Sequence, residues 1–475
     1  MNFNLYHDGL FLSITLESSV NQMKILTNKT ELDINDFQQI LKVHNNDYKH
    51  KMKLKGYYIG KHDILNKRGR PNNAPNNRIV SNFCQYIADM STGFFLGKPV
   101  AYSTLKEYQS KLDILLEIFR YNDESAHNLE LAEEASITGE SYEILYTDND
   151  AAIRFKSIPS EEMILVCEST LEENILYAIR HYRVYNFDGA TYTEYVEVYD
   201  KSSIRYYDYS GTRLTLTDTR PNYFDDVPII DFPNNKQRRG DFENVISLVD
   251  AYNMAQSLSL DDLMDFTDAF LVLKGMGGTD SEDIKKLRNN KVIVLDDPNG
   301  SADWLIKNLN DSYIENLKNR LQVDIHKFSN IADMSDSNFV GNSSGIAIKY
   351  KLIGLEQIRS RKEREFKKAL QRRIELISGM LKTKSKDAID FRDVEITFTP
   401  NIPANNQEQA QIVKELEGVV SKKKLLSLLP FVEDPVAEIE ELKREQEESD
   451  ESLRDEENYD YEEETETGLL AAQID

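Results

Sequence analysis

The sequence has few cysteines, no long apolar run and no segment that resembles a secretion signal. Its 475 residues include two cysteines, Cys84 and Cys167, which form neither a disulfide framework nor a metal-binding motif and suit a reducing compartment. No stretch reaches the roughly eighteen apolar residues that a transmembrane helix needs. Residues 1–19 lack a basic region followed by a sustained apolar core, so we expect no signal peptide. Secreted, disulfide-stabilised and membrane-spanning classes are therefore not expected.

The common catalytic and nucleotide-binding motifs are also missing. Residues 93–99 (GFFLGKP) have three residues between the glycines instead of four, and Pro99 replaces the Ser or Thr that would hold magnesium. The seven histidines are scattered, and no Gly-x-Ser-x-Gly elbow occurs. Asp261, Asp262 and Asp265 form the densest acidic cluster on an expected helix, which leaves a metal-dependent DNA-processing enzyme as an alternative. Such clusters are more often solvated faces, so we expect no catalytic residue, metal or cofactor.

Charge is distributed unevenly along the chain. The net charge is −25, whereas residues 346–382 contain eleven Lys or Arg and four Asp or Glu, a local net of +7. This segment predicts one basic helix, which at 37 residues would be about 55 Å long. Residues 433–475 contain nineteen acids and three bases, and past about Glu445 we expect a disordered acidic tail. The acidic balance argues against tight wrapping of nucleic acid.

A polar loop precedes the basic helix. Residues 333–345 are rich in Ser, Asn and Gly, a composition that favours mobility over packing. Their one bulky apolar pair is Phe339 and Val340. This pair either docks on its own domain, which composition alone favours, or is presented to a partner.

Hydrophobic periodicity predicts an α+β protein. Helices are expected over 28–53, capped by Thr30 or Asp33, over 77–92, ended by Gly93, and over 104–121 and 122–138, ended by Gly139. Tyr-rich alternation then predicts an antiparallel meander with one solvated face, turning at 148–150, 188–189 and 210–211. The remaining expected elements are helices at 241–268, about 280–289 and 309–330, strands at 269–275, 291–297 and 394–399, and two short helices in 406–427 broken near Gly418.

Two stretches carry a family resemblance. NRIVSNFCQYIADMSTGFFLGKPVAYS (77–103) and FVGNSSGIAIKYKLIGLEQIRSRKEREFKKAL (339–370) resemble the portal proteins of long-tailed bacteriophages, in the subgroup common in phages of Gram-positive hosts. The segment DAYNMAQSLSLDDLMDFTDAFLVLKG (250–275) lies between them and also fits. The resemblance covers roughly residues 30–450 and is specific, because three separated segments occur in order.

The resemblance implies a domain layout for the α+β portal fold. A mixed α/β wing would span 1–240, with a return strand at 384–402. Stem helices would span 241–268 and 309–332, with a small α/β clip at 269–308 between them. A tunnel loop would follow at 333–345, then a long spanning helix at 346–383, a helical crown at 403–445 and a disordered acidic tail at 446–475.

The resemblance also implies a function. Twelve copies would form a ring at one capsid vertex, and double-stranded DNA would be packaged through it by the terminase large subunit and later ejected. The ring would carry the head–tail connector (adaptor) and meet the scaffolding and major capsid proteins. The protein would belong to the virion, and to the host cytoplasm during assembly, without membrane contact or enzymatic activity. Neutral and acidic channel walls suit DNA that must slide without sticking.

Two sets of residues are candidate sites under this interpretation. The tunnel loop would line the narrowest part of the channel, with Phe339 and Val340 near its tip; its candidate residues are Ser335, Asp336, Ser337, Asn338, Phe339, Val340, Gly341 and Asn342. These residues include no Lys or Arg, so we expect steric and weakly polar contact with DNA. In a head-to-tail ring, acids of one stem helix would lie beside bases of the neighbour's; these are Asp261, Asp262 and Asp265, and Lys318, Arg320 and Lys327.

Overall fold

The computed structural model describes residues 24–71, 74–211, 213–265, 270–274, 301–305, 311–334, 350, 352–384, 386–401, 406–429 and, in part, 432–446. The chain divides into two compact units. The first comprises Met1–Asp336 and Lys351–Asn401, and the second comprises Ser337–Tyr350 and Ile402–Asp475. Both helices and strands are abundant, which confirms the α+β class.

The first unit contains a six-stranded sheet in the order β1-β5-β6-β7-β8-β9. The predicted meander is confirmed from β6 to β9, whereas β1 and β5, which pair in parallel, were not predicted. The strands are β1 Lys24–Thr27, β5 Met163–Glu168, β6 Ile175–Tyr185, β7 Tyr192–Tyr199, β8 Ser203–Tyr209 and β9 Leu214–Pro221.

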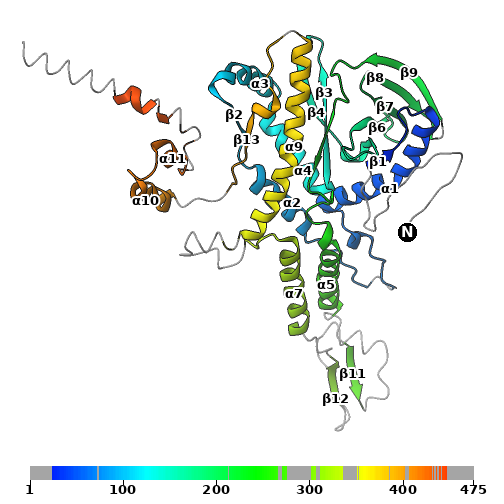
Figure 1. Ribbon diagram of the computed structural model, residues 1–475. Coiled ribbons are helices and arrows are strands. Elements are labelled where there is room, and N and C mark those ends of the chain that lie inside the picture. The colour runs from blue at the N-terminus through cyan, green and yellow to red at the C-terminus, as the bar shows by residue number, and fades with distance from the viewer. Residues whose placement is uncertain are drawn as a thin grey trace, which may run out of the picture. The chain divides into compact units, whose positions relative to one another are not determined.

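Helix α1 (Ile34–Tyr58) covers one face of this sheet (Figure 1). Its residues Phe37 and Ile40 pack in one buried cluster with Val196 and Val198 of β7. Asp33 caps the helix in a reciprocal capping box with Asp36, so of the two expected caps Asp33 is the one used.

A second sheet has the order β10-β3-β4. Its strands are β3 Glu140–Thr147, β4 Ile153–Ile158 and β10 Ile229–Pro233, and the predicted β3–β4 hairpin is confirmed. Helices α3 (Gln109–Tyr121) and α4 (Glu124–Thr138) precede it, and Gly139 ends α4 with a φ of 93°, a conformation that favours glycine.

The long basic helix is α9 (Ile353–Thr383). Its 31 residues span about 46 Å. The expected start at residue 346 falls within residues 335–349, which, like residue 351, lie outside the described part. Phe366 and Leu370 of α9 pack in one buried cluster with Phe95 and Phe232. We call residues 24–240, α9 and the two-stranded sheet of β2 (Ala101–Ser103) and β13 (Glu395–Thr397) the body.

Helix α2 (Phe83–Leu96) corrects one prediction. It begins six residues after the expected start at 77, and it continues through Gly93 to a cap at Gly97. Gly97 approaches the backbone of Gly93 and the side chain of Asn401 too closely for a Cβ atom, so the required glycine is the later one.

The other elements complete both units. In the first unit, helices α5 and α7 flank a hairpin of β11 and β12, and the expected helix at 280–289 and strand at 291–297 lie outside the described residues. The bounds are β2 Ala101–Ser103, β13 Glu395–Thr397, α5 Ile246–Asp265, β11 Phe270–Lys274, β12 Ser301–Leu305 and α7 Asp311–Ser329. Short 3-10 turns are η1 Asp63–Asn66, η3 Lys106–Tyr108, η4 Ser160–Glu162, η5 Glu243–Val245 and η8 Phe391–Asp393.

In the second unit, α10 (Asn406–Leu416) and α11 (Lys422–Leu426) are separated at Gly418, as predicted. Across the described residues of the chain, no helix is both long and apolar enough to cross a membrane.

Candidate functional site: the α5–α7 helix pair and its junction with the body

Helices α5 and α7 contact each other along their length (Figure 1), and we call them the helix pair. They correspond to the two segments expected to form a stem. Helix α5 begins at Ile246, later than the expected residue 241, and α7 is described from Asp311, because residues 306–310 lie outside the described part.

An extended strap, residues 77–81, fixes α5 against the body. The backbone N–H groups of Asn77, Ile79 and Ser81 donate to side chains of α5 at 2.6, 2.9 and 2.8 Å. The acceptors are Asp261 Oδ1, Ser257 Oγ and Asn253 Oδ1, all buried.

The two spacings of this ladder match. Donors two residues apart on an extended chain are about 6.6 Å apart, and acceptors four residues apart on a helix rise about 6 Å. The ladder explains why 77–82 is not helical despite its apolar spacing, because a helix would turn these N–H groups away from α5.

The carboxylate of Asp261 forms its hydrogen bonds and its ion pair within this junction. It also accepts from Lys67 Nζ at 2.5 Å and from Asn77 Nδ2 at 2.8 Å. Burial alone would raise its pKa, but the Asn77 backbone N–H and the Lys67 ammonium outweigh it, and the pKa is lowered. Asp261 therefore acts within its own chain as an anionic acceptor.

A buried ion pair joins α9 to the start of the helix pair. Lys362 Nζ of α9 lies 2.5 Å from Asp241 Oδ2, and both side chains are about 5% exposed or less. Asp241 also accepts from Ser136 Oγ at 2.5 Å and from Asn234 Nδ2 at 2.8 Å. Burial lowers the pKa of Lys362, and Asp241 only partly offsets this.

A second buried cation locks α9 to the β10-β3-β4 sheet. Arg373 is 0% exposed and donates to both carboxylate oxygens of Glu143, at 2.9 and 2.6 Å. It also donates to Glu124 Oε1 at 3.2 Å and to Asn128 Oδ1 at 2.8 Å. Burial would raise the pKa of Glu143, but Arg373 and His127 reverse this and lower it. Part of the positive charge expected on this helix is therefore buried in ion pairs inside the body.

The expected DNA-contacting residues 335–342 lie outside the described part, but the described flanks place the loop's origin. Tyr86 of α2 donates through its hydroxyl to Ala332 O at 3.0 Å and accepts from Met334 N at 3.1 Å. On the other flank, Gly354 in the first turn of α9 packs against the backbone of Asn330. The described residues on either side of this segment therefore lie where α2, α7 and α9 meet.

The three expected bases of α7 differ in their surroundings. Lys318 is 14% exposed and forms an ion pair with Glu315 of the same helix. Arg320 is 77% exposed, with its Nε 3.3 Å from Asp324 Oδ2. Lys327 is exposed and lies over the Phe328 ring, 5.6 Å from its centroid.

The expected acids of α5 are likewise divided. Asp261 is buried in the strap junction, Asp262 is half-buried, and Asp265 is the last residue of the helix. Among the residues that the structure describes, no group of three or more His, Cys, Asp or Glu is arranged to hold a metal ion.

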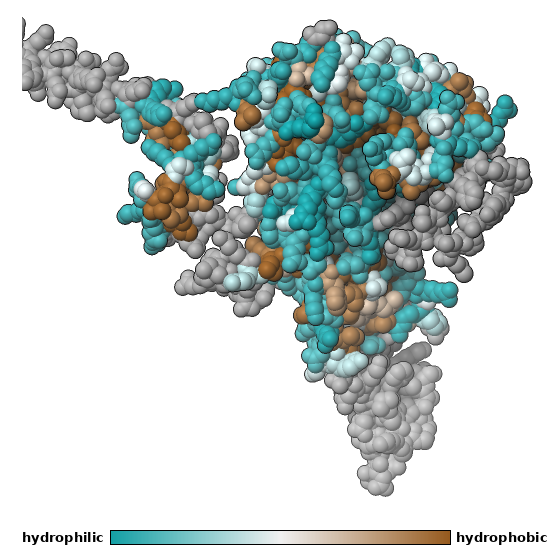
Figure 2. Space-filling model, viewed as in Figure 1, coloured by the Kyte–Doolittle hydropathy of each residue, from teal (hydrophilic) through white to brown (hydrophobic). Residues whose placement is uncertain are grey.

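Large exposed apolar side chains on the helix pair were not anticipated from the sequence. Figure 2 shows brown, hydrophobic surface over the part of the molecule that α5 and α7 form. The exposed fractions of these side chains range from 40% to 66%; they are Met254, Leu258, Leu263 and Met264 on α5, and Tyr313, Leu317, Val323 and Phe328 on α7. The sequence interpretation of these two segments used their charged residues. Their apolar residues occupy more than one face of each helix, and this pattern could have indicated the exposed apolar surface. Contiguous exposed apolar surface of this kind marks an interaction site.

Comparison with known proteins gives a consistent family. A sequence model described as "Phage portal protein, SPP1 Gp6-like" matches residues 38–452. The portal protein of Clostridium phage phiCD119 is 26% identical over 422 residues, covering 82% of this chain and 91% of that protein. The portal protein of Bacillus phage SPP1 is 26% identical over 461 residues, covering 87% of each.

Solved structures with similar chains include two necks. A chain from the neck of an empty GTA particle, computed with C6 symmetry, aligns with a TM-score of 0.47 at 14% identity, covering 74% of this chain and 90% of that one. A chain from the neck of a native GTA particle, computed with C12 symmetry, aligns with a TM-score of 0.43 at 13% identity, covering 79% and 99%.

Proposed function

Because this chain belongs to the SPP1 Gp6-like family of phage portal proteins, we propose that twelve copies close a ring at one capsid vertex, with double-stranded DNA passing along its axis. As a portal protein the chain is a component of the virion and assembles as an oligomeric ring. The number twelve and the path of the DNA come from the family resemblance.

The exposed apolar surface of the helix pair is the observation that supports ring closure. In a head-to-tail ring each copy offers two different surfaces to its neighbours, and α5 and α7 each expose apolar side chains, such as Leu263 at 61% and Val323 at 60%. We propose that α5 of one copy packs beside α7 of the next. Burying this surface would supply most of the contact free energy, because exposed ion pairs contribute only about 0.2–1 kcal/mol each.

Charge has a smaller part in this contact than the sequence suggested. Asp261 is held within its chain, and Lys318 and Arg320 already have partners on their own helix. The pairing of acids with a neighbour's bases therefore remains a proposal for Asp262, Asp265, Lys318, Arg320 and Lys327, in which Lys318 and Arg320 would have to exchange partners.

The DNA contact is proposed for residues 335–342. They follow the Tyr86 anchor, which holds both Ala332 and Met334, so one end of the segment is fixed and its apolar pair Phe339-Val340 is set a few residues beyond. With no Lys or Arg in the segment, contact with the phosphates would be steric and would not hold the duplex in place.

The partners follow from this role. The terminase large subunit would dock on the ring during packaging and supply ATP hydrolysis, and a head–tail connector would replace it. The scaffolding and major capsid proteins would meet the ring in the host cytoplasm during assembly. The chain itself would be a conduit without enzymatic activity, metal or cofactor; the alternative is a metal-dependent DNA-processing enzyme.

Two measurements test the proposal. Mass photometry of the purified protein should give one species near twelve subunits, and linear DNA incubated with the protein and magnesium should remain intact. Monomers that hydrolyse DNA would overturn the portal role in favour of the enzyme.

The DNA contact is tested separately by deleting residues 337–340. Rings should form normally, whereas packaging of DNA into procapsids should fall. Normal filling with the deleted protein would remove the loop from the DNA path while leaving ring assembly untouched.

A further inference from the structure

The second unit carries a cluster of lysines on its two helices. Helix α11 places Lys422, Lys423 and Lys424 in succession, and all three are exposed, whereas the next residue, Leu425, is buried. Lys414 of α10 is exposed as well. Within the described residues, none of these four ammonium groups forms a hydrogen bond or an ion pair. The cluster is therefore a set of cations still available to an anionic partner.

Exposed apolar side chains adjoin these lysines. Val419 is 74% exposed, Val420 is 37% exposed and Ile412 of α10 is 41% exposed. The turn between α10 and α11 fixes the two valines, because their backbone N–H groups both donate to Leu416 O, at 3.0 and 3.3 Å. A segment that is both acidic and apolar would complement the lysines and the apolar side chains together.

The chain itself contains a segment of this composition beyond the described part, which ends at Gln446. Residues 447–475 hold thirteen Asp or Glu and one Arg, and twelve of these acids lie in 447–466. The largely apolar stretch GLLAAQI follows at 468–474. Acidic and apolar residues therefore adjoin each other in this segment, as basic and apolar residues do on α10 and α11.

The length of the chain permits the contact. Gln446 follows Lys424 by 22 residues and belongs to the same unit. Residues 455–466 begin nine residues further on, a span of up to about 30 Å when extended, whereas α10 is about 16 Å long. A tether of this kind gives an effective concentration on the order of millimolar, so a contact with a Kd of about 1 mM would be formed roughly half of the time.

We propose that residues 447–474 fold back onto α10 and α11 of the same chain, with their carboxylates against the lysines and their apolar end against Val419 and Val420. Because the whole chain carries a net charge of −25, its other surfaces repel the segment on average, and the lysine cluster attracts it. The segment then covers lysines that would otherwise bind the phosphates of nucleic acid. The contact is independent of ring closure and of the path of the DNA.

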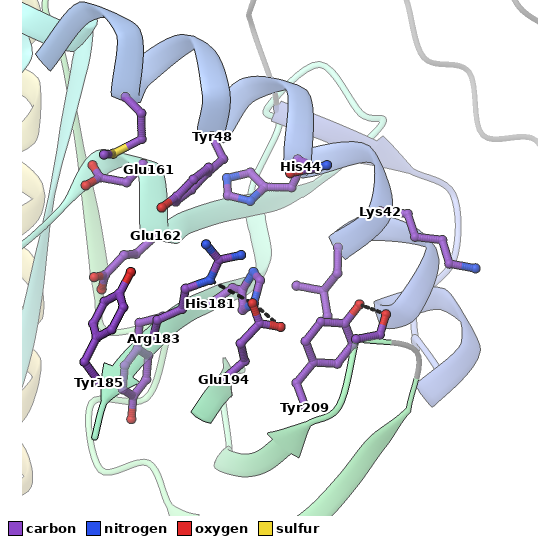
Figure 3. A pocket seen from close by; sticks show the side chains of 15 residues that line it. Lys42, His44, Tyr48, Glu161, Glu162, His181, Arg183, Tyr185, Glu194 and Tyr209 are labelled. Atoms are coloured by element: carbon purple, nitrogen blue, oxygen red, sulfur yellow. Dashed lines mark hydrogen bonds and ion pairs between the residues drawn. The ribbon is translucent and has the colours of Figure 1, made fainter. Parts of the chain in front are cut away.

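Cross-linking of the full-length protein tests the contact directly. A water-soluble carbodiimide joins a carboxylate to an amine only where the two touch, so peptide mapping should find links between the lysines of α11 and acids of 447–466. These links should fall about fivefold or more in 1 M NaCl, where the Debye length is about 3 Å. Lys42 is the matched control, because it is exposed and points away from the other side chains labelled in Figure 3, and it should give no such link.

Isotope labelling separates contact within a chain from contact between chains. In protein assembled from nitrogen-15-labelled and unlabelled chains, a link within one chain joins two peptides of the same isotope. A link to a neighbouring copy joins both isotopes in a large share of the products. We expect links of a single isotope.

Retention of a short DNA duplex at low salt tests the consequence of the contact. Changing the eight Asp and Glu residues of 455–466 to Asn and Gln should free the lysines and raise retention about fivefold or more. Adding Lys422→Gln, Lys423→Gln and Lys424→Gln should abolish that gain. The matched control adds Lys42→Gln, Lys49→Gln and Lys201→Gln, at three exposed lysines of the first unit, and should keep most of it.

Three outcomes would overturn the proposal. One is the absence of cross-links between the lysines of α11 and residues 447–466. Another is a set of links that chiefly join two chains, which would assign the lysines to a neighbouring copy. The third is DNA retention that does not rise when the acids are neutralised, or a rise that survives replacement of the three lysines. Circular dichroism of each variant ensures that a changed retention is not a changed fold.

Discussion

The interface of α9 with the rest of the body and the α5–α7 helix pair use their side chains in opposite ways. Along α9, even a guanidinium is fully buried, and Arg373 finds carboxylate and amide partners for its hydrogen bonds inside one chain. On the helix pair, Leu263 and Val323 remain about 60% exposed. The buried charges of the first region find their partners within a single chain. The second region exposes apolar side chains of the kind that a protein core normally buries.

This difference separates folding from assembly. The buried charges of the body have their partners within the same chain, so we expect the body to keep its shape whether or not neighbours are present. Removing one of these partners would leave an uncompensated buried charge. An exposed apolar helix pair gains stability only when another surface covers it. Changes in the body should therefore alter the stability of the chain, and changes on the helix pair should alter the ring.

Breaking the buried network should have the largest effect. We expect Arg373→Ala to lower the free energy of unfolding by about 3–5 kcal/mol, because the buried Glu143 would lose both hydrogen bonds from the guanidinium and keep the one to His127. The neighbouring Arg372, whose side chain is 32% exposed and paired with Asp226 and Glu375, is the matched control. Arg372→Ala should cost about 1 kcal/mol or less in urea unfolding followed by circular dichroism. Equal losses in the two variants would contradict the assigned role of Arg373.

Acid should weaken the body through His44. Burial lowers the pKa of its imidazole in the folded state to about 3, against 6.5 ordinarily. Above pH 6.5 neither state holds the proton, and stability is unaffected. As the pH falls below 6.5 only the unfolded chain takes up the proton, so stability should fall by about 1.4 kcal/mol per pH unit, or about 2 kcal/mol at pH 5.

The measurement is the slope of unfolding free energy against pH between 6.5 and 5. His44→Gln should flatten that slope. A slope that is unchanged by His44→Gln would assign the acid sensitivity to other groups.

Two glycines of α9 should respond in opposite ways to substitution by alanine, because one of them contacts the end of the helix pair and the other does not. A Cβ atom at Gly354 would lie 2.7 Å from the backbone O of Asn330, just after α7, whereas at Gly379 nothing lies within 4 Å. Gly379→Ala should stabilise the protein by about 0.5–1 kcal/mol through helix propensity. Gly354→Ala should destabilise it by about 1–2 kcal/mol, because the backbone must shift. The same sign for both in urea unfolding would refute the close contact.

Polar substitution on the helix pair should affect assembly alone. Leu263→Ser and Val323→Ser should each weaken the contact between subunits by about 1 kcal/mol, because less apolar surface is buried, with little change in the unfolding of a single chain. Leu171, which is fully exposed in a turn of the body, gives the control Leu171→Ser. Mass photometry on dilution should show earlier dissociation for the first two and parent behaviour for the third. Rings of equal stability in all three would remove the helix pair from the interface.

Charge reversal should have the smallest effect. Lys318→Glu combined with Arg320→Glu should weaken rings only at low salt, by about 0.2–1 kcal/mol for each pair lost. A matched reversal at Lys24 and Glu173, an ion pair between β1 and the β5–β6 turn, should leave assembly unchanged. If the rings of the α7 variant are as stable as the parent's in low salt, the pairing of acids with a neighbour's bases is wrong.

Periodicity predicted the elements whose pattern is local. The β6–β9 meander, the caps at Asp33 and Gly139 and the break at Gly418 follow from alternation and turn chemistry within a few residues. The start of α2 could not be predicted, because the hydrogen bonds that hold 77–81 extended come from α5, more than 170 residues later. Strand β1 escaped detection for the same reason, since its partner β5 is distant in sequence.

The sequence predicted which segments form the candidate site, but it did not predict which of their charged residues are buried and paired within the chain. Sequence patterns located both helices of the pair, but charge alone could not separate Asp261, buried against the strap, from Asp262, which is half-buried. Nor could it separate Arg373 from the exposed bases of the same helix. Tyr86 offered no signal, because a single tyrosine on a helix becomes an anchor only through the backbone that folds against it.

The strap of residues 77–81 has a mechanical consequence. Its three hydrogen bonds to α5 are arranged along the helix, between two chain segments that run beside each other. A pull along the axis of α5 would load them in shear and together, so that none can yield before the others. A force transverse to the axis would instead peel them one at a time from an end. These three hydrogen bonds should therefore resist a pull along α5 more strongly than a bend of the helix away from the strap.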